Sequence, residues 1–205
     1  MTLQELKKKC LYCHGCSLCE GRHNLVFGVG NEKAEIMLIG EGPGEQEDLK
    51  GEPFVGPAGH LLDTMLESVF LHRSDVYIAN IVKCRPPRNR DPLPEEQEMC
   101  RKWLNAQLSI IRPRIIVCLG RIAAQALIKE DFRITKEHGL WSVKDGALIV
   151  ATYHPSALLR DVRKRPEAFQ DWKEIRSKID DFCIAGYDDL DTFYSRGNKT
   201  DNTAD

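Results

Sequence analysis

The sequence predicts an α/β fold, a three-layer α/β/α sandwich around a central four-stranded, mainly parallel sheet. Four short apolar runs have the length and composition of buried strands: residues 35–40, 75–80, 114–120 and 147–152. A segment with helical periodicity follows each run. Strands that alternate with helices form parallel βαβ units, which place helices on both faces of the sheet. The 205 residues are enough for one domain with a sizeable core.

Composition narrows the class of protein. Hydrophobic residues make up 42% of the chain and charged residues 29%, which is typical of a globular protein. No apolar run approaches the roughly 18 residues of a membrane span, and no signal-peptide pattern is present. We therefore expect a cytoplasmic, nucleoid-associated monomer without a membrane partner. One domain is expected over residues 1–186, with a polar, disordered tail over residues 187–205.

The first predicted strand opens into a loop of unusual composition. A short lysine-rich helix is expected over residues 2–9. The first strand then ends at Gly40, and the loop over residues 41–59 holds five glycines, three prolines and five acidic residues. Glycine lets the main chain approach a ligand closely, and open α/β sheets build their sites at the carboxyl ends of strands. Phe54 is the only aromatic residue in this loop, where it could stack on a flat ligand. A tight turn followed by a solvated acidic loop is the alternative.

The remaining elements follow in regular order. A helix with Pro57 in its first turn precedes the second strand, which ends at Asn80. A proline-rich basic loop then leads to a helix over residues 95–111, which Pro113 stops. The third strand leads to a helix over residues 121–129, and the fourth ends before His154. The chain is then helical from residue 156 to about 179, interrupted by a basic stretch at residues 160–165.

Three polar residues stand where predicted parallel strands end. Glu41 follows the first strand, Asn80 ends the second, and His154 follows the fourth. Taken singly, an asparagine at a strand end is usually a turn or cap residue, and a histidine before proline is usually a turn residue. Because the carboxyl ends of parallel strands meet at one edge, the three should converge there. Their convergence predicts a functional site.

Eight cysteines suggest metal binding. In a protein expected to be intracellular, they are better explained as metal ligands than as disulfides. Cys10, Cys13, Cys16 and Cys19 are spaced by three, as in a bacterial ferredoxin, but the longer final spacing and the following proline are missing. Cys118 lies within an apolar strand and is expected to be a core residue.

Four motifs occur in the order found in a known family. These are Gly40-Glu-Gly-Pro-Gly44, Gly51-Glu-Pro-Phe-Val-Gly-Pro-Ala-Gly59, Asn80 with Lys83-Cys-Arg-Pro-Pro87, and His154-Pro-Ser-Ala-Leu-Leu-Arg160. The set resembles the family 4 uracil-DNA glycosylases, the iron–sulfur members of their superfamily, over roughly residues 10–179. The resemblance implies a base-excision-repair enzyme that flips uracil out of DNA and hydrolyses its N-glycosidic bond, leaving an abasic site.

The resemblance also implies a 4Fe–4S cluster with a structural role. Its ligands would be Cys13, Cys16, Cys84 and Cys100. Cys10 and Cys19 depart from the family pattern, and Cys19 leaves the choice of ligands open. Zinc is the competing metal, because four thiolates suit it equally well.

The family motifs imply a role for each site residue. The backbone of Gly40 and Gly42 would line the pocket, and Phe54 would stack under the flipped base. Asn80 would read the uracil edge and reject cytosine, which presents the opposite donor and acceptor pattern. His154 would donate a hydrogen bond to uracil O2 as negative charge builds there.

An acidic residue would position the water or support the cationic sugar. We expect Glu41 in this role, with Glu45, Glu47 or Asp48 as alternatives. Glu47 is also a candidate for excluding the thymine methyl group. No lysine is an obvious Schiff-base nucleophile, so lyase activity is not expected.

Two basic stretches would contact DNA phosphates on either side of the extruded nucleotide. They are Lys83, Arg85, Arg88 and Arg90, and Arg160, Arg163, Lys164 and Arg165. Leu158 or Leu159 would fill the vacated stack as an apolar wedge. The partner is uracil-containing DNA, single- or double-stranded. Recruitment by a sliding clamp stays open, because no clear clamp-binding motif stands out in the C-terminal extension.

Three alternatives fit the sequence less well. Relatives that trap uracil-DNA covalently carry a basic, histidine-containing insert, and residues 83–99 contain no histidine. A non-catalytic iron–sulfur module would have lost the pocket residues, yet Glu41, Phe54, Asn80 and His154 are present. A dinucleotide-binding enzyme needs Gly-x-Gly-x-x-Gly at its first turn, which residues 40–45 do not match.

Overall fold

The computed structural model describes residues 1–183 and contains one six-stranded sheet in the order β1-β3-β2-β4-β6-β5. The strands are β1 (Val29–Gly30), β2 (Ile36–Gly40), β3 (Val76–Asn80), β4 (Ile115–Leu119), β5 (Ser142–Lys144) and β6 (Ala147–Thr152). The four predicted strands are β2, β3, β4 and β6, which pair in parallel as expected. β1 and β5 are short antiparallel edge strands. They are not predicted, because their exposed residues form no apolar run.

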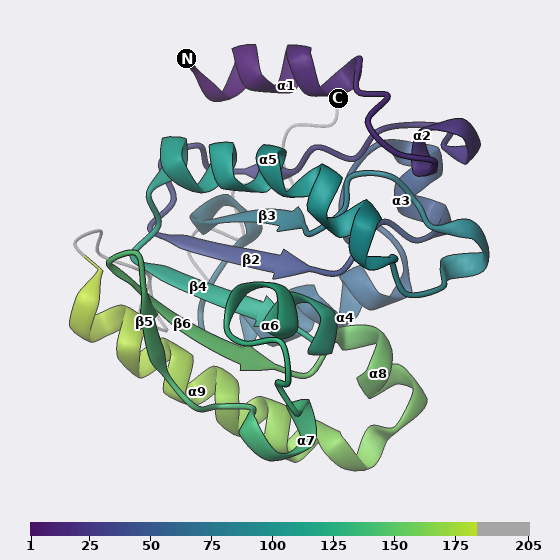
Figure 1. Cartoon of the computed structure of the whole chain (residues 1–205). Helices are drawn as coiled ribbons and strands as arrows, with labels where there is room; N and C mark the ends of the chain where they lie inside the picture. The colour runs from purple at the N-terminus through teal and green to yellow at the C-terminus, as the bar shows by residue number, and fades with distance from the viewer. Residues whose placement is uncertain (184–205) are drawn as a thin grey trace, which may run out of the picture.

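Helices cover both faces of the sheet (Figure 1). They are α1 (Leu3–Leu11), α2 (Leu18–Gly21), α3 (Glu45–Lys50), α4 (Pro57–Glu67), α5 (Pro94–Ile111), α6 (Arg121–Leu127), α7 (Ile134–Glu137), α8 (Pro155–Arg160) and α9 (Arg165–Phe182). α1, α5 and α6 pack on one face, and α4, α8 and α9 on the other. The predicted three-layer sandwich is confirmed. Within residues 1–183, no helix is both long and apolar enough to cross a membrane.

Strand alternation explains the two cores. Successive side chains of a strand point to opposite faces. In β2, Met37 and Ile39 pack toward α1 and α5, whereas Ile36 and Leu38 pack toward α4 and α9. All five β2 residues are buried, as expected for a parallel strand covered on both sides. Trp172 of α9 is fully buried in the second core.

The strand ends are level along one edge of the sheet. Gly40 pairs with Asn80 at the ends of β2 and β3, and Leu119 pairs with Thr152 at the ends of β4 and β6. From β2 the chain passes to β3 on one side and then to β4 on the other. This reversal leaves a crevice at the carboxyl end of β2, where open α/β sheets bind ligands.

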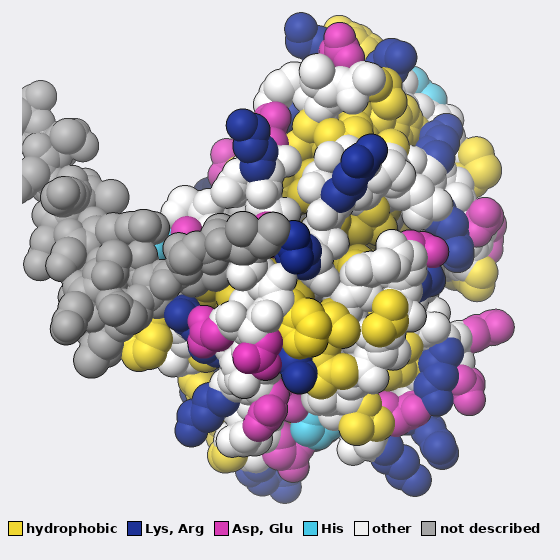
Figure 2. All heavy atoms as spheres, turned by 90° about the vertical axis from the view of Figure 1, so that its left-hand side faces the viewer, with side chains coloured by type: hydrophobic (Ala, Val, Ile, Leu, Met, Phe, Trp, Pro, Cys, Tyr) yellow, Lys and Arg dark blue, Asp and Glu magenta, His cyan; other side chains and the backbone are white. Residues whose placement is uncertain are grey.

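The surface at the amino ends of the strands carries a mixture of side-chain types. Figure 2 looks onto the side that lies at the left in Figure 1, where the strands begin. Positively and negatively charged side chains are interspersed there with hydrophobic ones. The predicted tail over residues 187–205 lies outside the described residues.

Candidate active site

A cavity of about 430 Å³ lies at the carboxyl edge of the sheet. Its lining includes Glu41, Gly42, Phe54, Asn80 and His154. These residues come from three strand ends and the loop before α4, and the sequence predicted all five as site residues. The convergence of distant polar residues is therefore present in the structure. The other polar and aromatic lining residues are Glu47, Asn89, Arg90, Asp91, Arg121, Tyr153, Ser156 and Arg160.

Gly40 is not among the residues that line this cavity, but close packing at Gly40 brings two of the lining side chains together. A Cβ atom on Gly40 would lie 2.5 Å from Asn80 Oδ1 and 2.8 Å from Phe54 Cζ. Only glycine lets the two side chains approach the end of β2 this closely. Phe54 is buried and has a φ of 55°, a left-handed conformation rare for aromatic residues. Its ring lies 5.5 Å from the His154 ring, centroid to centroid.

Asn80 presents an unused hydrogen-bond acceptor. Its side chain is buried, and Asn80 Oδ1 has no hydrogen-bond partner among residues 1–183. A buried polar atom without a partner is costly in a folded protein, and such atoms are found where a ligand completes the bonding. Asn80 Oδ1 is thus available to an N–H donor in the cavity.

Glu47 holds the loop that carries Phe54. Its Oε1 accepts hydrogen bonds from the main-chain N–H groups of Val55 and Gly56, both at 2.9 Å, and its Oε2 accepts from Gly44 at 3.1 Å. These contacts join α3, a helix that the sequence pattern did not predict, to the loop before α4. The acidic residues belong to the start of α3, where they complement the helix dipole.

The other acidic alternatives are also accounted for. Asp48 is buried and accepts hydrogen bonds from the main-chain N–H of His23 at 2.9 Å, while its Oδ2 lies 2.6 Å from His23 Nδ1. Glu45 is exposed and lies 3.6 Å from Arg85. Glu41 lines the cavity without such a structural bond among the described residues. It is the acid best placed to act there.

His154 is fixed in one tautomer. It caps the first turn of α8, and its Nδ1 accepts a hydrogen bond from the main-chain N–H of Ser156 at 3.1 Å. Ser156 Oγ lies 2.8 Å from the same nitrogen. Because Nδ1 accepts, the proton of the neutral ring is on Nε2. Burial lowers the pKa of His154 to about 4, and the charge of Arg160 adds to this shift. The ring is neutral at pH 7 and has one N–H to donate.

The pKa of Glu41 is shifted upwards, in the direction opposite to that of His154. Burial raises the pKa of Glu41 to about 7, and the negative charge of Asp91 contributes, whereas Arg121 and Arg160 oppose the rise. The carboxyl group therefore changes charge near neutral pH. The two pKa shifts have the same main cause, because a poorly solvated cavity disfavours the charged form of both Glu41 and His154.

The structure contradicts two of the predicted DNA contacts. Lys83 is fully buried, and its Nζ donates to main-chain and side-chain oxygens inside the protein, so the prediction that it contacts phosphate is wrong. Leu158 is also fully buried, in the core beneath α8, and cannot be the wedge. Leu159, the alternative, is 42% exposed.

The remaining predicted basic contacts keep positions compatible with that role. Arg88 and Arg160 are exposed, and Arg160 lines the cavity. Arg85 is partly buried, with its Nε donating to Asn89 Oδ1 at 2.7 Å. Arg163 is exposed but already paired with Asp161 at 2.8 Å. Their contacts with DNA stay predictions.

A second, small cavity gathers cysteines from distant segments. Its lining includes Cys13, Cys16, Cys84 and Cys100, together with Cys19. No cysteine in residues 1–183 forms a disulfide. No group of three or more His, Cys, Asp or Glu side chains in this part of the chain is arranged to hold a single metal ion. Cys118 is fully buried within β4, in the core position expected for it.

Hydrogen-bond donors surround the sulfur atoms of this cavity. Trp103 Nε1 lies 3.2 Å from Cys13 Sγ, Arg22 Nη1 lies 3.2 Å from Cys84 Sγ, and the Lys83 main-chain N–H lies 3.3 Å from Cys100 Sγ. Such donors stabilise thiolates, which are the metal-binding form of cysteine. The four predicted cysteines are therefore brought together, with donors directed at three of their sulfur atoms. Burial raises the pKa of Cys84 to about 11 and also raises the pKa values of Cys16 and Cys100, so a bound cation is needed to stabilise the thiolates.

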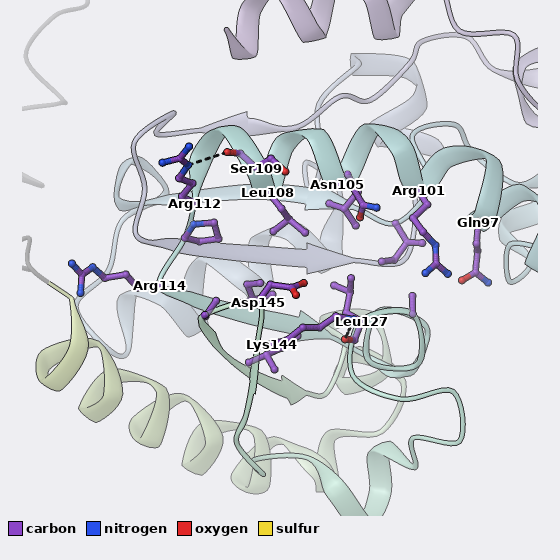
Figure 3. A pocket seen from close by; sticks show the side chains of 18 residues that line it. Gln97, Arg101, Asn105, Leu108, Ser109, Arg112, Arg114, Leu127, Lys144 and Asp145 are labelled. Carbon is purple, nitrogen blue, oxygen red and sulfur yellow. Dashed lines mark hydrogen bonds between the residues drawn. The ribbon is translucent and has the colours of Figure 1, made fainter. Parts of the chain in front are cut away.

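A cavity of about 1050 Å³, larger than the candidate active site, lies elsewhere. It runs between α5, α6 and the β5–β6 hairpin, and Figure 3 shows Arg101, Arg112, Arg114 and Lys144 around it. It contains none of the predicted site residues and does not reach the strand ends that carry Glu41, Asn80 and His154. The volume of a cavity alone therefore does not identify the candidate active site.

Comparison with known proteins agrees with this geometry. The sequence model of the Uracil DNA glycosylase superfamily matches residues 27–175. The chain belongs to this superfamily. The matched region begins before β2 and ends within α9, so it includes every strand end that lines the cavity.

Individual members of the superfamily give a closer assignment. The type-4 uracil-DNA glycosylase of Archaeoglobus fulgidus is 48% identical over 184 residues, covering 85% of this chain and 92% of the relative. That of Sulfurisphaera tokodaii is 44% identical, covering 85% and 84%. A type-5 uracil-DNA glycosylase of Pyrobaculum aerophilum is 33% identical, covering 63% and 64%. The resemblance to family 4 is confirmed.

Several lining residues were not predicted from the sequence, and Arg121 is the one whose charge acts on Glu41. Arg121 begins α6, directly after β4, and lines the cavity next to Glu41. The rule that located Glu41, Asn80 and His154 would also have located Arg121, because it follows the carboxyl end of the third predicted strand.

The Glu47 contacts predict a local change in dynamics. Replacing Glu47 with Gln removes a charged acceptor shared by three main-chain N–H groups, each such bond contributing about 1.5–3 kcal/mol. We expect hydrogen exchange at Gly44, Val55 and Gly56 to become at least about tenfold faster. Glu45→Gln, an exposed neighbour in α3, is the control and should leave these amides unchanged. Equal exchange in both variants would contradict the role of Glu47.

Proposed function

We propose that this protein is a monofunctional uracil-DNA glycosylase that extrudes uracil from DNA and hydrolyses the N-glycosidic bond, releasing uracil and leaving an abasic site. The observation that carries the proposal is the buried, unpartnered Asn80 Oδ1 in the cavity with Phe54 and His154. Type-4 uracil-DNA glycosylases as close as 48% identity support the same activity.

Base selection follows from the fixed amide of Asn80. Its Oδ1 accepts from uracil N3–H, and its NH₂ group donates to uracil O4. Cytosine has an acceptor at N3 and a donor at C4, so it would leave buried polar groups unpaired. Phe54, held by the loop that Glu47 fixes, stacks on the base. Glu47 stays our candidate for excluding the thymine methyl group.

Bond cleavage places negative charge on uracil and positive charge on the sugar. The His154 Nε2–H donates to uracil O2 as the leaving anion forms, which a neutral ring can do without a prior change of charge. In its ionised form, Glu41 positions the attacking water and stabilises the cationic sugar. The backbone of Gly40 and Gly42 shapes the pocket around these groups.

DNA would approach along the basic residues beside the cavity. Arg85, Arg88, Arg160 and Arg163 would contact phosphates, and Leu159, which is 42% exposed, would be the apolar wedge. We expect a monomer acting on single- or double-stranded DNA at the nucleoid, in the cytoplasm. Association with a sliding clamp stays a prediction, and the C-terminal extension considered for it falls mostly outside the described residues.

A 4Fe–4S cluster is the proposed occupant of the cysteine cavity. Cys13 and Cys16 would hold it from the N-terminal segment, Cys84 from the loop after β3, and Cys100 from α5. The N–H groups that point at the sulfur atoms fit this assignment. When bound, the cluster supplies a cross-link among these segments and takes no part in bond cleavage.

The first prediction tests the activity and the reading of the base. An oligonucleotide with one uracil should be cleaved at that position after enzyme and alkali treatment, whereas a thymine oligonucleotide should stay intact. Asn80→Asp places negative charge against the leaving uracil and should slow excision by about 10²-fold or more. His154→Ala should slow it by about 10²–10³-fold. No cleavage by the folded, iron-containing wild type would overturn the proposed function.

The second prediction concerns pH. Because ionised Glu41 is the active form and its pKa is about 7, kcat/KM should rise as pH increases through 7 and level off above it. His154 has a pKa of about 4 and stays neutral across this range, so it adds no second limb above pH 5. Glu41→Gln should lower activity and flatten the profile. An unchanged profile in Glu41→Gln would remove this residue from the mechanism.

The third prediction concerns the metal. Cys100→Ser should lose bound iron and acid-labile sulfide and lower thermal stability, because one ligand of the cluster is missing. Cys118→Ser changes a buried cysteine of β4 outside the cavity and should retain iron. Metal and sulfide analysis of the purified proteins decides the question. Zinc without sulfide in the wild type would refute the iron–sulfur assignment.

A further inference from the structure

Lys83 links the cysteine cavity to the base-reading residue. It lines the cavity beside Cys84 and Cys100, and its main-chain N–H donates to Cys100 Sγ at 3.3 Å. Its side chain points the other way along the chain, with Nζ donating to the Asn80 carbonyl oxygen at 2.9 Å. One residue therefore contacts both a predicted cluster ligand and the main chain of Asn80.

Within the described residues, the charge of Lys83 has no carboxylate partner. The side chain is fully buried, and its acceptors are two neutral oxygens, the Asn80 carbonyl and Gln107 Oε1 at 2.7 Å. Among residues 1–183, no ion pair with an acidic side chain includes Lys83. A buried ammonium group is costly unless opposite charge lies nearby.

An occupied cysteine cavity would supply that opposite charge. Four thiolates around a doubly positive metal group leave a net charge of about −2. The bridge of Lys83 between this group and the Asn80 carbonyl would then be favourable at both ends. The alternative, that Lys83 serves only to fill space in the core, leaves its charge without a counterpart.

The backbone around Lys83 transmits its position to the pocket. On the pocket side, Ile81 N–H donates to the Gly40 carbonyl at 2.9 Å, and Val82 N–H donates to the Glu41 carbonyl at 3.1 Å. The segment from Asn80 to Cys84 is thus attached to the uracil pocket at one end and to the cysteines at the other. A shift of Lys83 would tilt the peptide that carries the Asn80 carbonyl.

We propose that Lys83 is a positioning residue that couples the metal group to uracil recognition, its ammonium balancing the charge of the thiolate-bound group while it holds the main chain of Asn80. The inference rests on the proposed role of Asn80. It assigns to the metal site an effect on substrate affinity in addition to its effect on stability.

Lys83→Met tests both ends of the bridge, because it keeps the length of the side chain and removes the charge and donors. We expect the reconstituted variant to have a more negative cluster reduction potential, since a nearby cation is lost. The oligonucleotide concentration that half-saturates single-turnover excision should rise about tenfold, the effect of losing one well-placed hydrogen bond. The maximal rate should change less.

Lys102→Met is the matched control. Lys102 is exposed in α5 and lies near the same cavity, within 3.8 Å of the Cβ position of Gly15. Water screens its charge, and its ammonium group lies over the Trp103 ring rather than against Asn80. We expect its potential and half-saturating concentration to stay close to those of the wild type.

Gln107→Glu separates charge from position and serves if Lys83→Met does not fold. The new carboxylate would lie against Lys83 Nζ and neutralise it, while the bond to the Asn80 carbonyl remains. The substitution also removes the hydrogen bonds that Gln107 Nε2 donates to the Phe27 carbonyl at 2.9 Å and to Tyr77 Oη at 3.3 Å, so the fold of the variant is checked first by circular dichroism. The potential should become more negative, and the half-saturating concentration should stay within about twofold of the wild type. An unchanged potential in Gln107→Glu would overturn the charge pairing.

The two proposals fail in different ways. If Asn80→Asp excises uracil like the wild type, Asn80 does not recognise the base. The proposed coupling through Lys83, which rests on that role, is then wrong as well. If Asn80→Asp is impaired but folded Lys83→Met binds the oligonucleotide like the wild type, the coupling alone is wrong. A half-saturating concentration raised in Lys83→Met and unchanged in Lys102→Met supports it.

Discussion

The site depends on the close approach of three chain segments around Gly40. Pairing of Gly40 with Asn80 places the end of β3 directly beside the end of β2. The missing side chain at Gly40 then leaves room for the Phe54 ring and the Asn80 amide in the same small volume. A methyl group at this position would push against both. The Phe54 ring and the Asn80 amide, which we propose stack on the base and read its edge, can therefore lie side by side only because β2 ends in glycine.

The loop after β2 keeps this arrangement in place from the other side. Gly59 lies so close to Phe54 that a Cβ atom there would overlap the Phe54 carbonyl, at 1.8 Å. The same carbonyl accepts a hydrogen bond from Arg73 Nη2, and Glu47 holds the following main-chain N–H groups. Phe54 is therefore fixed in an uncommon backbone conformation by contacts on both sides. Strain of this kind persists only where the surroundings over-determine it.

Sequence periodicity was sufficient for the architecture and for the strand ends. Buried parallel strands form continuous apolar runs, so four of the six strands and the convergence of Glu41, Asn80 and His154 could be predicted. Side-chain direction in irregular segments could not. Lys83 begins a run of basic residues in the sequence, yet its loop turns it into the core. Leu158 and Leu159 are adjacent in a six-residue helix, too short for periodicity to show which one is buried.

The electrostatics of the cavity suit a reaction that creates charge within it. Burial raises the pKa of Glu41 to about 7 and lowers that of His154 to about 4, so both shifts favour the uncharged groups. A protonated histidine would attract the leaving uracil more strongly, but burial makes its charge costly before the bond breaks. A neutral His154 with a fixed Nε2–H is instead oriented in advance, and in the proposed mechanism an ionised Glu41 complements the charge of the sugar. The two groups would divide the work above pH 7, where Glu41 is mostly ionised and His154 stays neutral.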